Sequence, residues 1–349
     1  MEEKRLFQAM HEAVRQVVET RMAEGLFPSA AVRVFDREQT LMTAEFGGAR
    51  AQSVFDVASL TKIATATQIL FLISSGRLSL ADRILSVLPS LNESRLLKSR
   101  LSGVDLYSLL THTSGIVDWY AFYAHRDLPF EEVLAITLER YGRVEGMVYS
   151  DLNFMLLGKV LEQLQCKPLD ACLREDLVLP LKLGNMGYHP DPADDIIPSS
   201  YGNPIEEEMC AQRNIPFDGW RAHEPLIGGC NDGNAYYYFG GAAGSAGIFA
   251  DALSYERLCR FYMTSDDPLM IRAQQNLETG RGLGLETGVR YPQGCGHTGF
   301  TGTSIYFSKA LNIGVVAFTN RLYLKDPLPE GMQAFRRELH EAVVRVLVS

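Results

Sequence analysis

Two pairs of strand-like segments at opposite ends of the chain constrain its fold more than any other feature. Residues 30–35 and 40–46 are largely apolar runs around the polar turn 36–39, which predicts an N-terminal hairpin. Residues 303–308 and 312–319 form a second such pair, joined by a short turn. Each pair has a helical pattern beside it, so we expect one antiparallel sheet assembled from both ends of the chain.

The segments between the two hairpins read differently. Helical spacing is found near 59–75, 129–140, 150–165 and 168–177, and also in the terminal segments 2–24 and 330–347. The pattern predicts an α+β fold: an antiparallel sheet of five or more strands flanked by helices from both termini, with a mainly helical insertion. We place the sheet domain at 1–56 and 239–349 and the helical domain at 57–238, with the active site in the cleft between them.

Composition narrows the class of function. The 349 residues are 46% hydrophobic, enough for a substantial core, and carry a net charge of −9 without runs of Lys or Arg. This argues against nucleic-acid and membrane partners and favours a small-molecule substrate. No secretory signal or membrane-spanning run is seen, which predicts a cytoplasmic protein. The six cysteines are scattered and no His or Cys stands at metal-ligand spacing, so we expect neither metal nor cofactor.

Ser59 and Lys62 form a Ser-x-x-Lys at the start of an apolar helical run. Three residues of separation place both side chains on one helix face, where the amine can reach the hydroxyl. A serine needs such a neighbour to become a nucleophile, and a helix N-terminus favours developing negative charge. The alternative is that Ser59 only caps the helix.

Tyr149 precedes another apolar helical run, at 154–161. A phenolate held beside a lysine ammonium is a plausible general base. The alternative is that Tyr149 packs in the core while Ser150 or Asp151 caps the helix.

A glycine-rich stretch, residues 296–303, leads directly into the strand at 303–308. Its glycines would let a substrate lie against the backbone, and an edge strand can offer N–H groups to an oxyanion. Gly294, Gly296 and Gly299 match a dinucleotide-binding spacing, but that fingerprint must open a helix, whereas this one opens a strand.

These three segments match a known pattern in their order and spacing. Ser-x-x-Lys at 59–62, Tyr-Ser-Asp at 149–151 and His-Thr-Gly at 297–299 resemble the serine β-lactamase and penicillin-binding-protein superfamily. Residues 109–116 (LLTHTSGI) and the glycine-rich 240–249 agree with it. The resemblance covers about residues 27 to 320 and is closest to class C β-lactamases and their related esterases.

The resemblance implies a β-lactamase/transpeptidase-like fold and assigns roles. Ser59 would attack a carbonyl and form an acyl-enzyme, while Lys62 and Tyr149 would share the proton transfers in a division that the sequence leaves open. The backbone N–H groups of Ser59 and Phe300 would form the oxyanion hole. The substrate would lie along the strand residues Thr298 and Gly299.

Two departures from the antibiotic-hydrolysing members bear on the substrate. His297 stands where they carry Lys, so this position has at most a partial charge near neutral pH. Asp151 stands where they carry Asn, and an ionised carboxylate accepts hydrogen bonds without donating. Both changes predict weaker binding of an anionic β-lactam. Asp151 is also placed to keep Lys62 protonated, which would shift the base role toward Tyr149.

We therefore predict a serine hydrolase acting on a small-molecule ester or amide, of carboxylesterase type. A D-amino-acid peptidase or amidase and a weak β-lactamase are the alternatives within this class. A non-catalytic binding protein that retains the fold is the alternative from another class. We expect residues 190–238 to line the pocket and His112 and Asp118 to be structural, while the oligomeric state is left open.

Overall fold

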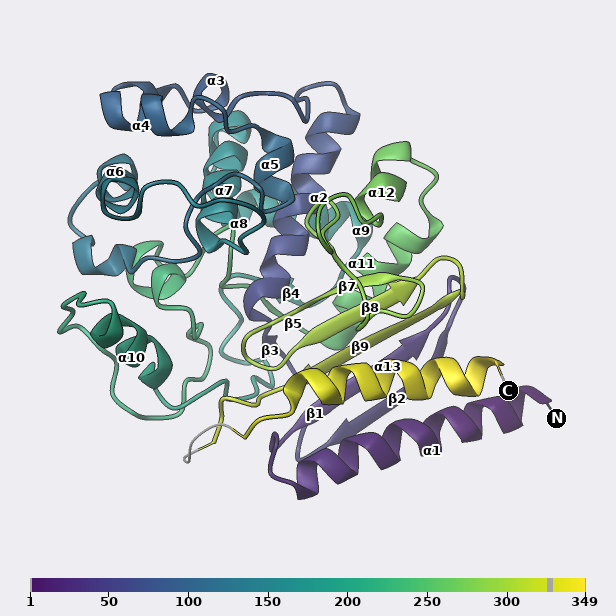
Figure 1. Cartoon of the computed structure of the whole chain (residues 1–349). Coiled ribbons are helices and arrows are strands. Elements are labelled where there is room, and N and C mark those ends of the chain that lie inside the picture. The colour runs from purple at the N-terminus through teal and green to yellow at the C-terminus, as the bar shows by residue number, and fades with distance from the viewer. Residues whose placement is uncertain (1, 325–328, 349) are drawn as a thin grey trace.

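A six-stranded antiparallel sheet, in the order β2-β1-β9-β8-β7-β6, lies below a mainly helical region in the computed structural model, which describes residues 2–324 and 329–348 (Figure 1). The N-terminal strand β1 pairs directly with the C-terminal strand β9, which confirms a sheet built from both ends of the chain. The strands of this sheet are β1 (Ala30–Phe35), β2 (Thr40–Phe46), β6 (Glu286–Thr287), β7 (Cys295–Thr298), β8 (Ser304–Ser308) and β9 (Ile313–Thr319).

Both faces of this sheet are buried, which explains the nearly continuous apolar run in β9. Val32 lies opposite Ala317 and Val34 opposite Val315, and all four face one hydrophobic cluster. The alternate residues, such as Phe318, face the other cluster, because successive side chains of a strand point to opposite faces.

Two terminal helices cover the first face of the sheet. They are α1 (Glu2–Ala23) and α13 (Met332–Val348), which run side by side in Figure 1. Phe335 of α13 packs on Phe27 with ring centroids 4.9 Å apart. Arg21 and Glu338 join the two helices in an ion pair of 2.6 Å. The sequence predicted both helices to within two residues at each end.

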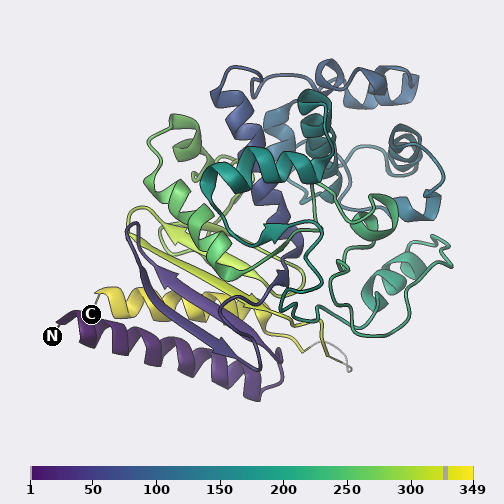
Figure 2. The same ribbon diagram turned by 180° about the vertical axis from the view of Figure 1, so that it is seen from behind.

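Helix α11 (Ala252–Thr264) covers the opposite face and is seen from behind in Figure 2. Helix α11 was not predicted from the sequence. Its buried residues Tyr255, Leu258, Cys259 and Tyr262 follow helical spacing, so the signal was present.

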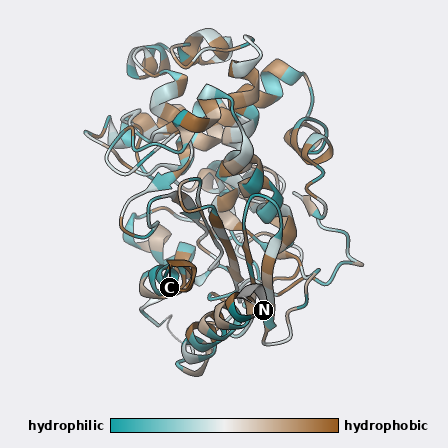
Figure 3. Ribbon diagram, turned by 90° about the vertical axis from the view of Figure 1, so that its right-hand side faces the viewer, coloured by the Kyte–Doolittle hydropathy of each residue, from teal (hydrophilic) through white to brown (hydrophobic). Residues whose placement is uncertain are grey.

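The helical region carries most of the remaining chain, and Figure 3 shows it above the part that holds both termini. A small sheet, in the order β3-β5-β4, joins this region to the rest. The strands of this small sheet are β3 (Phe55–Asp56), β4 (Met186–Gly187) and β5 (Phe249–Ala250). The remaining helices are α2 (Thr61–Ser74), α3 (Ile84–Val87), α4 (Arg95–Leu101), α5 (Leu106–Leu110), α6 (Phe130–Tyr141), α7 (Asp151–Gln165), α8 (Leu169–Leu173), α9 (Leu179–Leu181), α10 (Pro204–Gln212) and α12 (Pro268–Ala273). The short helical turns are η1 (Ala58–Leu60), η2 (Pro89–Asn92), η3 (Phe122–His125), η4 (Arg174–Val178) and η5 (Asn234–Tyr238).

The expected helix at 168–177 has a different form. Regular α-helix ends at Leu173, and a π-helical turn follows over Arg174–Val178. Pro180 has no N–H and its ring would clash with the carbonyl four residues earlier, so the helix widens before it.

Among the described residues, no helix combines the length and apolarity that a membrane span requires.

Candidate active site

A strained turn presents Ser59 ahead of α2. Ala58, the residue before it, has φ of 47°, which is uncommon for a residue with a side chain. Asp56 holds this turn, because its Oδ1 accepts the N–H of Ala58 at 2.9 Å. Helix α2 is buried on almost all sides, so the turn rests on a rigid support.

Lys62 lies one turn further on and is fully buried. Its Nζ donates to Ser59 Oγ at 2.8 Å and to the carbonyl of Ser245 at 3.0 Å, and it forms an ion pair of 2.7 Å with Asp151 Oδ1. An ammonium group has three donors and no acceptor, so these contacts occupy all of its hydrogens. In this arrangement Lys62 donates to Ser59 and cannot take its proton.

The charge state of Lys62 follows from two opposing effects. Burial lowers its pKa, but the interactions of its ammonium group with Asp151 and Tyr149 outweigh burial and raise the pKa overall. Lys62 is therefore an ammonium at neutral pH.

Tyr149 lies beside the Ser59–Lys62 pair at the start of α7. Lys62 Nζ lies 5.0 Å from the centre of its ring, and the guanidinium carbon of Arg281 lies at the same distance. The rings of His112 and His297 pack on it, with centroids at 4.6 and 5.9 Å. The phenol of Tyr149 thus lies between two cations and next to the Ser59–Lys62 pair.

His112 positions the backbone that follows Tyr149. Its Nδ1 accepts the N–H of Ser150 at 3.0 Å, and its side chain is 2% exposed. Burial, followed by the charges of Arg281 and Lys62, lowers its pKa well below the usual value, so Nδ1 stays free to accept this bond. The structure thus places His112 in a supporting position.

Asp118 lies apart from the reacting groups. Its carboxylate binds Arg213 at 2.8 Å, and its backbone carbonyl accepts the N–H of Asp151. This contact helps to hold the start of α7, in line with a structural role.

The turn between β7 and β8 is tied to the segment that carries Ser59. The Thr301 hydroxyl donates to the carbonyl of Asp56 at 2.7 Å, and the Thr303 hydroxyl donates to that of Val57 at 3.0 Å. A Cβ at Gly299 would lie 2.0 Å from Thr303 Oγ1, so only glycine fits this close approach. The Phe300 N–H has no partner within the described ranges, which leaves it available to an oxyanion.

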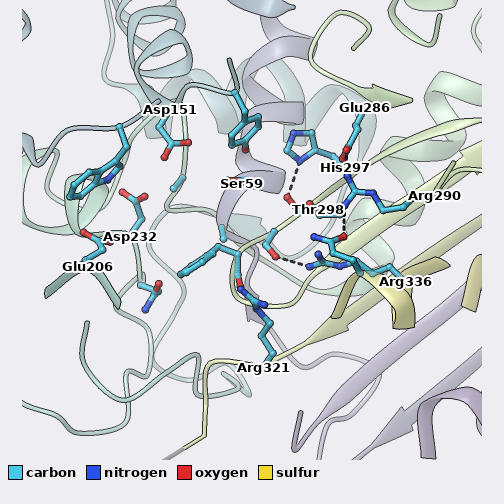
Figure 4. Close-up of a pocket in the computed structure, with 18 of the residues that line it drawn as sticks. Ser59, Asp151, Glu206, Asp232, Glu286, Arg290, His297, Thr298, Arg321 and Arg336 are labelled. Atoms are coloured by element: carbon cyan, nitrogen blue, oxygen red, sulfur yellow. Dashed lines mark hydrogen bonds and ion pairs between the residues drawn. The ribbon is translucent and has the colours of Figure 1, made fainter. Parts of the chain in front are cut away.

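These groups share one cavity of about 330 Å³ (Figure 4). Its lining joins residues from the C-terminal part of the chain, between Ala246 and Arg336, to residues from the helical region. The lining residues are Ala58, Ser59, Trp119, Tyr149, Asp151, Glu206, Met209, Asn231, Asp232, Ala246, Arg281, Glu286, Arg290, His297, Thr298, Gly299, Phe300, Arg321, Gln333 and Arg336.

All eight residues named from the sequence thus come together. Seven of them line the cavity, and the eighth, Lys62, lies directly behind Ser59. Four residues of the 190–238 segment also line the cavity, as expected: Glu206, Met209, Asn231 and Asp232.

Four arginines in the lining were not predicted. Arg290 pairs with Glu286, but Arg281, Arg321 and Arg336 have no carboxylate within 4.0 Å among residues 2–324 and 329–348. Arg336 is 3% exposed, and burial lowers its pKa to about 10. Arg281, Arg290 and Arg321 are isolated basic residues in the sequence, and Arg336 has only Arg337 beside it. No local pattern therefore predicts this group of arginines, and only the fold brings them together.

The arginines bear on the substrate prediction that was based on His297 and Asp151. Burial and the nearby charges of Arg281 and Lys62 lower the pKa of His297, so this side chain is neutral at pH 7. The cavity nevertheless keeps positive charge, and Lys62 neutralises Asp151. The replacements at these two positions therefore do not by themselves exclude an anionic substrate.

Comparison with known proteins agrees with this geometry. A model of the Beta-lactamase family matches residues 14–335. The chain belongs to the beta-lactamase family. Its members are hydrolases of the serine β-lactamase and penicillin-binding-protein type.

Three similar proteins illustrate the range of this family. An N-acetylmuramyl-L-alanine amidase of Bacillus subtilis is 27% identical in an alignment that covers 91% of this chain and 82% of the amidase. The structure of a class C beta lactamase superposes with a TM-score of 0.71 at 16% identity, covering 100% of this chain and 99% of the other. EstCE1, a hydrolase with promiscuous acyltransferase activity, gives 0.69 at 17% identity, with coverage of 97% and 99%. The fold is thus that of the β-lactamases and transpeptidases.

Proposed function

We propose that this beta-lactamase family member hydrolyses a small ester or amide through an acyl-enzyme on Ser59. The observation that carries the proposal is the contact of 2.8 Å between Ser59 Oγ and Lys62 Nζ at the edge of the cavity, with Tyr149 beside the pair. A purely binding function does not require this set of groups.

The proposed steps follow from the charge states. Ser59 Oγ attacks the carbonyl carbon, and its proton passes to the Tyr149 phenolate, because the ammonium of Lys62 has no free acceptor. The N–H groups of Ser59 and Phe300 bind the oxyanion. As the bond to the leaving group breaks, Tyr149 returns the proton to that group. Water then attacks the carbonyl carbon of the acyl-enzyme and gives its proton to Tyr149. The bond from this carbon to Ser59 Oγ breaks, Tyr149 returns the proton to Oγ, and the acid is released.

Covalent labelling tests the proposal. A fluorophosphonate probe should attach to Ser59 in the wild type, as located by mass spectrometry, and the label should be lost in Ser59→Ala. Absence of label in a folded wild-type protein would favour a non-catalytic binding protein.

A carboxylesterase is the first candidate, and an amidase or peptidase that releases an amino acid is the second. The arginines favour the second, because Arg321 and Arg336 lack a carboxylate partner in the described part of the chain and an amino-acid leaving group supplies one. The named amidase from Bacillus subtilis is in line with this choice.

Three substrates separate the candidates: a short-chain p-nitrophenyl ester, a D-alanyl anilide and a chromogenic cephalosporin. An esterase should turn over the ester with the highest kcat/KM. Faster cleavage of the anilide would favour the peptidase, and much faster cleavage of the cephalosporin would make this protein a β-lactamase.

A further inference from the structure

An acidic wall of the cavity has no part in the proposed steps. Glu206 of α10, Asp232 of the loop before η5 and Asp151 of α7 lie on one side of Ser59, and Arg290 and Arg336 lie on the other (Figure 4). Lys62 neutralises Asp151. Asp232 and Glu206 have no lysine or arginine within 4.0 Å in the part of the chain that the structure describes. No ion pair within this distance therefore balances the charge of Asp232 in the described ranges.

The wall is held firmly in place. The backbone N–H of Asn231 donates to Asp56 Oδ2 at 2.6 Å, and that of Gly233 donates to Glu206 Oε1 at 2.6 Å. A Cβ at Gly233 would lie 2.3 Å from Glu206, so the close approach requires glycine. Asp232, between these two anchors, accepts the N–H of Ala235 on Oδ1 at 2.7 Å. Its second oxygen has no hydrogen-bond partner among residues 2–324 and 329–348.

Trp119 is an independent sign of a ligand in the same place. Its side chain lines the cavity although it is only 5% exposed. Its indole N–H donates to no described residue. This N–H is not enclosed by protein atoms, so a ligand in the cavity can bring a carbonyl or similar oxygen to it as well as a cation to the wall.

The raised pKa values of the two carboxyl groups are in line with a cation-binding role of the wall. Burial and the charge of Asp151 raise the pKa of Asp232 to about 6, and burial and the charge of Asp232 raise that of Glu206 to about 8. Asp232 is thus mostly ionised at neutral pH. A bound cation would stabilise its ionised form.

We propose that this wall binds a protonated amine of the substrate, with Asp232 as the acceptor and Trp119 donating to a nearby substrate oxygen. The substrate class is then an ester or amide that carries an ammonium group close to the scissile carbonyl, such as an aminoacyl compound. This inference rests on the hydrolase function proposed above. Together with the unpaired arginines, it describes a cavity suited to small compounds that bear both charges.

Matched anilides test the ammonium site. Alanyl p-nitroanilide, in both enantiomers, should be cleaved with a kcat/KM at least ~10-fold above its N-acetyl counterpart, because a hydrogen bond to a charged group is lost on acetylation. In Asp232→Asn this preference should fall toward unity. Glu139→Gln, an exposed carboxylate on α6, should retain it.

The outcomes separate the two proposals. Equal rates for the free and acetylated anilides in the wild type would overturn the ammonium site and leave the hydrolase function standing. Absence of turnover together with absence of label at Ser59 would overturn the hydrolase function.

A binding measurement on the wild type keeps the inference testable if Asp232→Asn does not fold. Alaninamide should slow the labelling of Ser59 by the fluorophosphonate at a concentration at least ~10-fold below that of lactamide, which carries a hydroxyl in place of the ammonium. Equal protection by lactamide would contradict an ammonium site and indicate that the wall recognises hydroxyl groups.

Discussion

At the scale of single residues, the contacts of Lys62 decide how the proton transfers are divided. All three of its hydrogens have acceptors, and Asp151 and Tyr149 keep it charged. The sequence raised the possibility that Asp151 would shift the base role to Tyr149. The ion pair of 2.7 Å supports that hypothesis, because a lysine that stays protonated orients Ser59 but cannot deprotonate it.

Tyr149→Phe tests this division. The substitution keeps the ring that packs on His112 and removes the hydroxyl. We expect kcat to fall by ~10²–10⁴-fold, the usual contribution of a positioned acid or base, with little change in the melting temperature. Steady-state kinetics and thermal unfolding check both. Tyr236→Phe, at an exposed tyrosine outside the cavity, should keep full activity. Unchanged turnover in Tyr149→Phe would remove Tyr149 from the mechanism.

At the scale of elements, the turn that presents Ser59 depends on Asp56. Its two carboxylate oxygens accept the N–H groups of Ala58 and Asn231, at 2.9 and 2.6 Å. It thereby joins the strained turn to the acidic wall. Burial raises the pKa of Asp56, and the hydrogen bonds from the N–H groups of Asn231 and Ala58 oppose this effect by stabilising the ionised carboxylate.

We predict that Asp56→Ala slows labelling of Ser59 by ~10-fold or more and lowers the free energy of unfolding by ~1–3 kcal/mol, because two buried N–H groups lose their acceptors. Asp56→Asn, which keeps one acceptor oxygen, should lie between the alanine variant and the wild type. Labelling kinetics and denaturant unfolding measure the two effects. A labelling rate at the wild-type level in a folded Asp56→Ala would show that the turn holds without this carboxylate.

The elements also show what the sequence could predict. The hairpins at 30–46 and 303–319 and the helix α2 were predicted because their apolar periods are strong and local. Helix α11 was overlooked although its period was present. The π-helical turn before Pro180 depends on a backbone clash that a periodic pattern does not express.

The candidate site divides in the same way. Ser59, Tyr149 and His297 were found because they stand in short motifs with a recognisable order. Arg321 and Arg336 were missed because neither stands in a motif or a basic run of the sequence. Only the fold brings them to the cavity, where Arg336 of α13 is buried and Arg321 is partly exposed.

At the scale of the whole molecule, the cavity separates two kinds of charge. Apart from Glu286 of β6, which is paired with Arg290, the acidic residues of the cavity come from the helical region and the arginines from the chain around the sheet (Figure 4). Separated charges of this kind favour a substrate with opposite charges at its ends over an uncharged one. They also lower the stability of the folded protein, because ionising a buried carboxyl group that has no cationic partner costs free energy.

The raised pKa of Glu206 predicts how the stability of the protein changes with pH. Burial and Asp232 raise the pKa of Glu206 to about 8, so the folded protein keeps this proton at pH values where the unfolded chain has lost it. The folded state then binds more protons, and stability falls as pH rises from about 4.5, the range of an ordinary glutamate, to about 8. Glu206→Gln cannot titrate. Its free energy of unfolding, relative to the wild type, should therefore increase between pH 5 and pH 9 in guanidinium titrations. Glu139→Gln should follow the wild type at every pH. Parallel curves for Glu206→Gln and the wild type would show that Glu206 ionises freely in the folded protein.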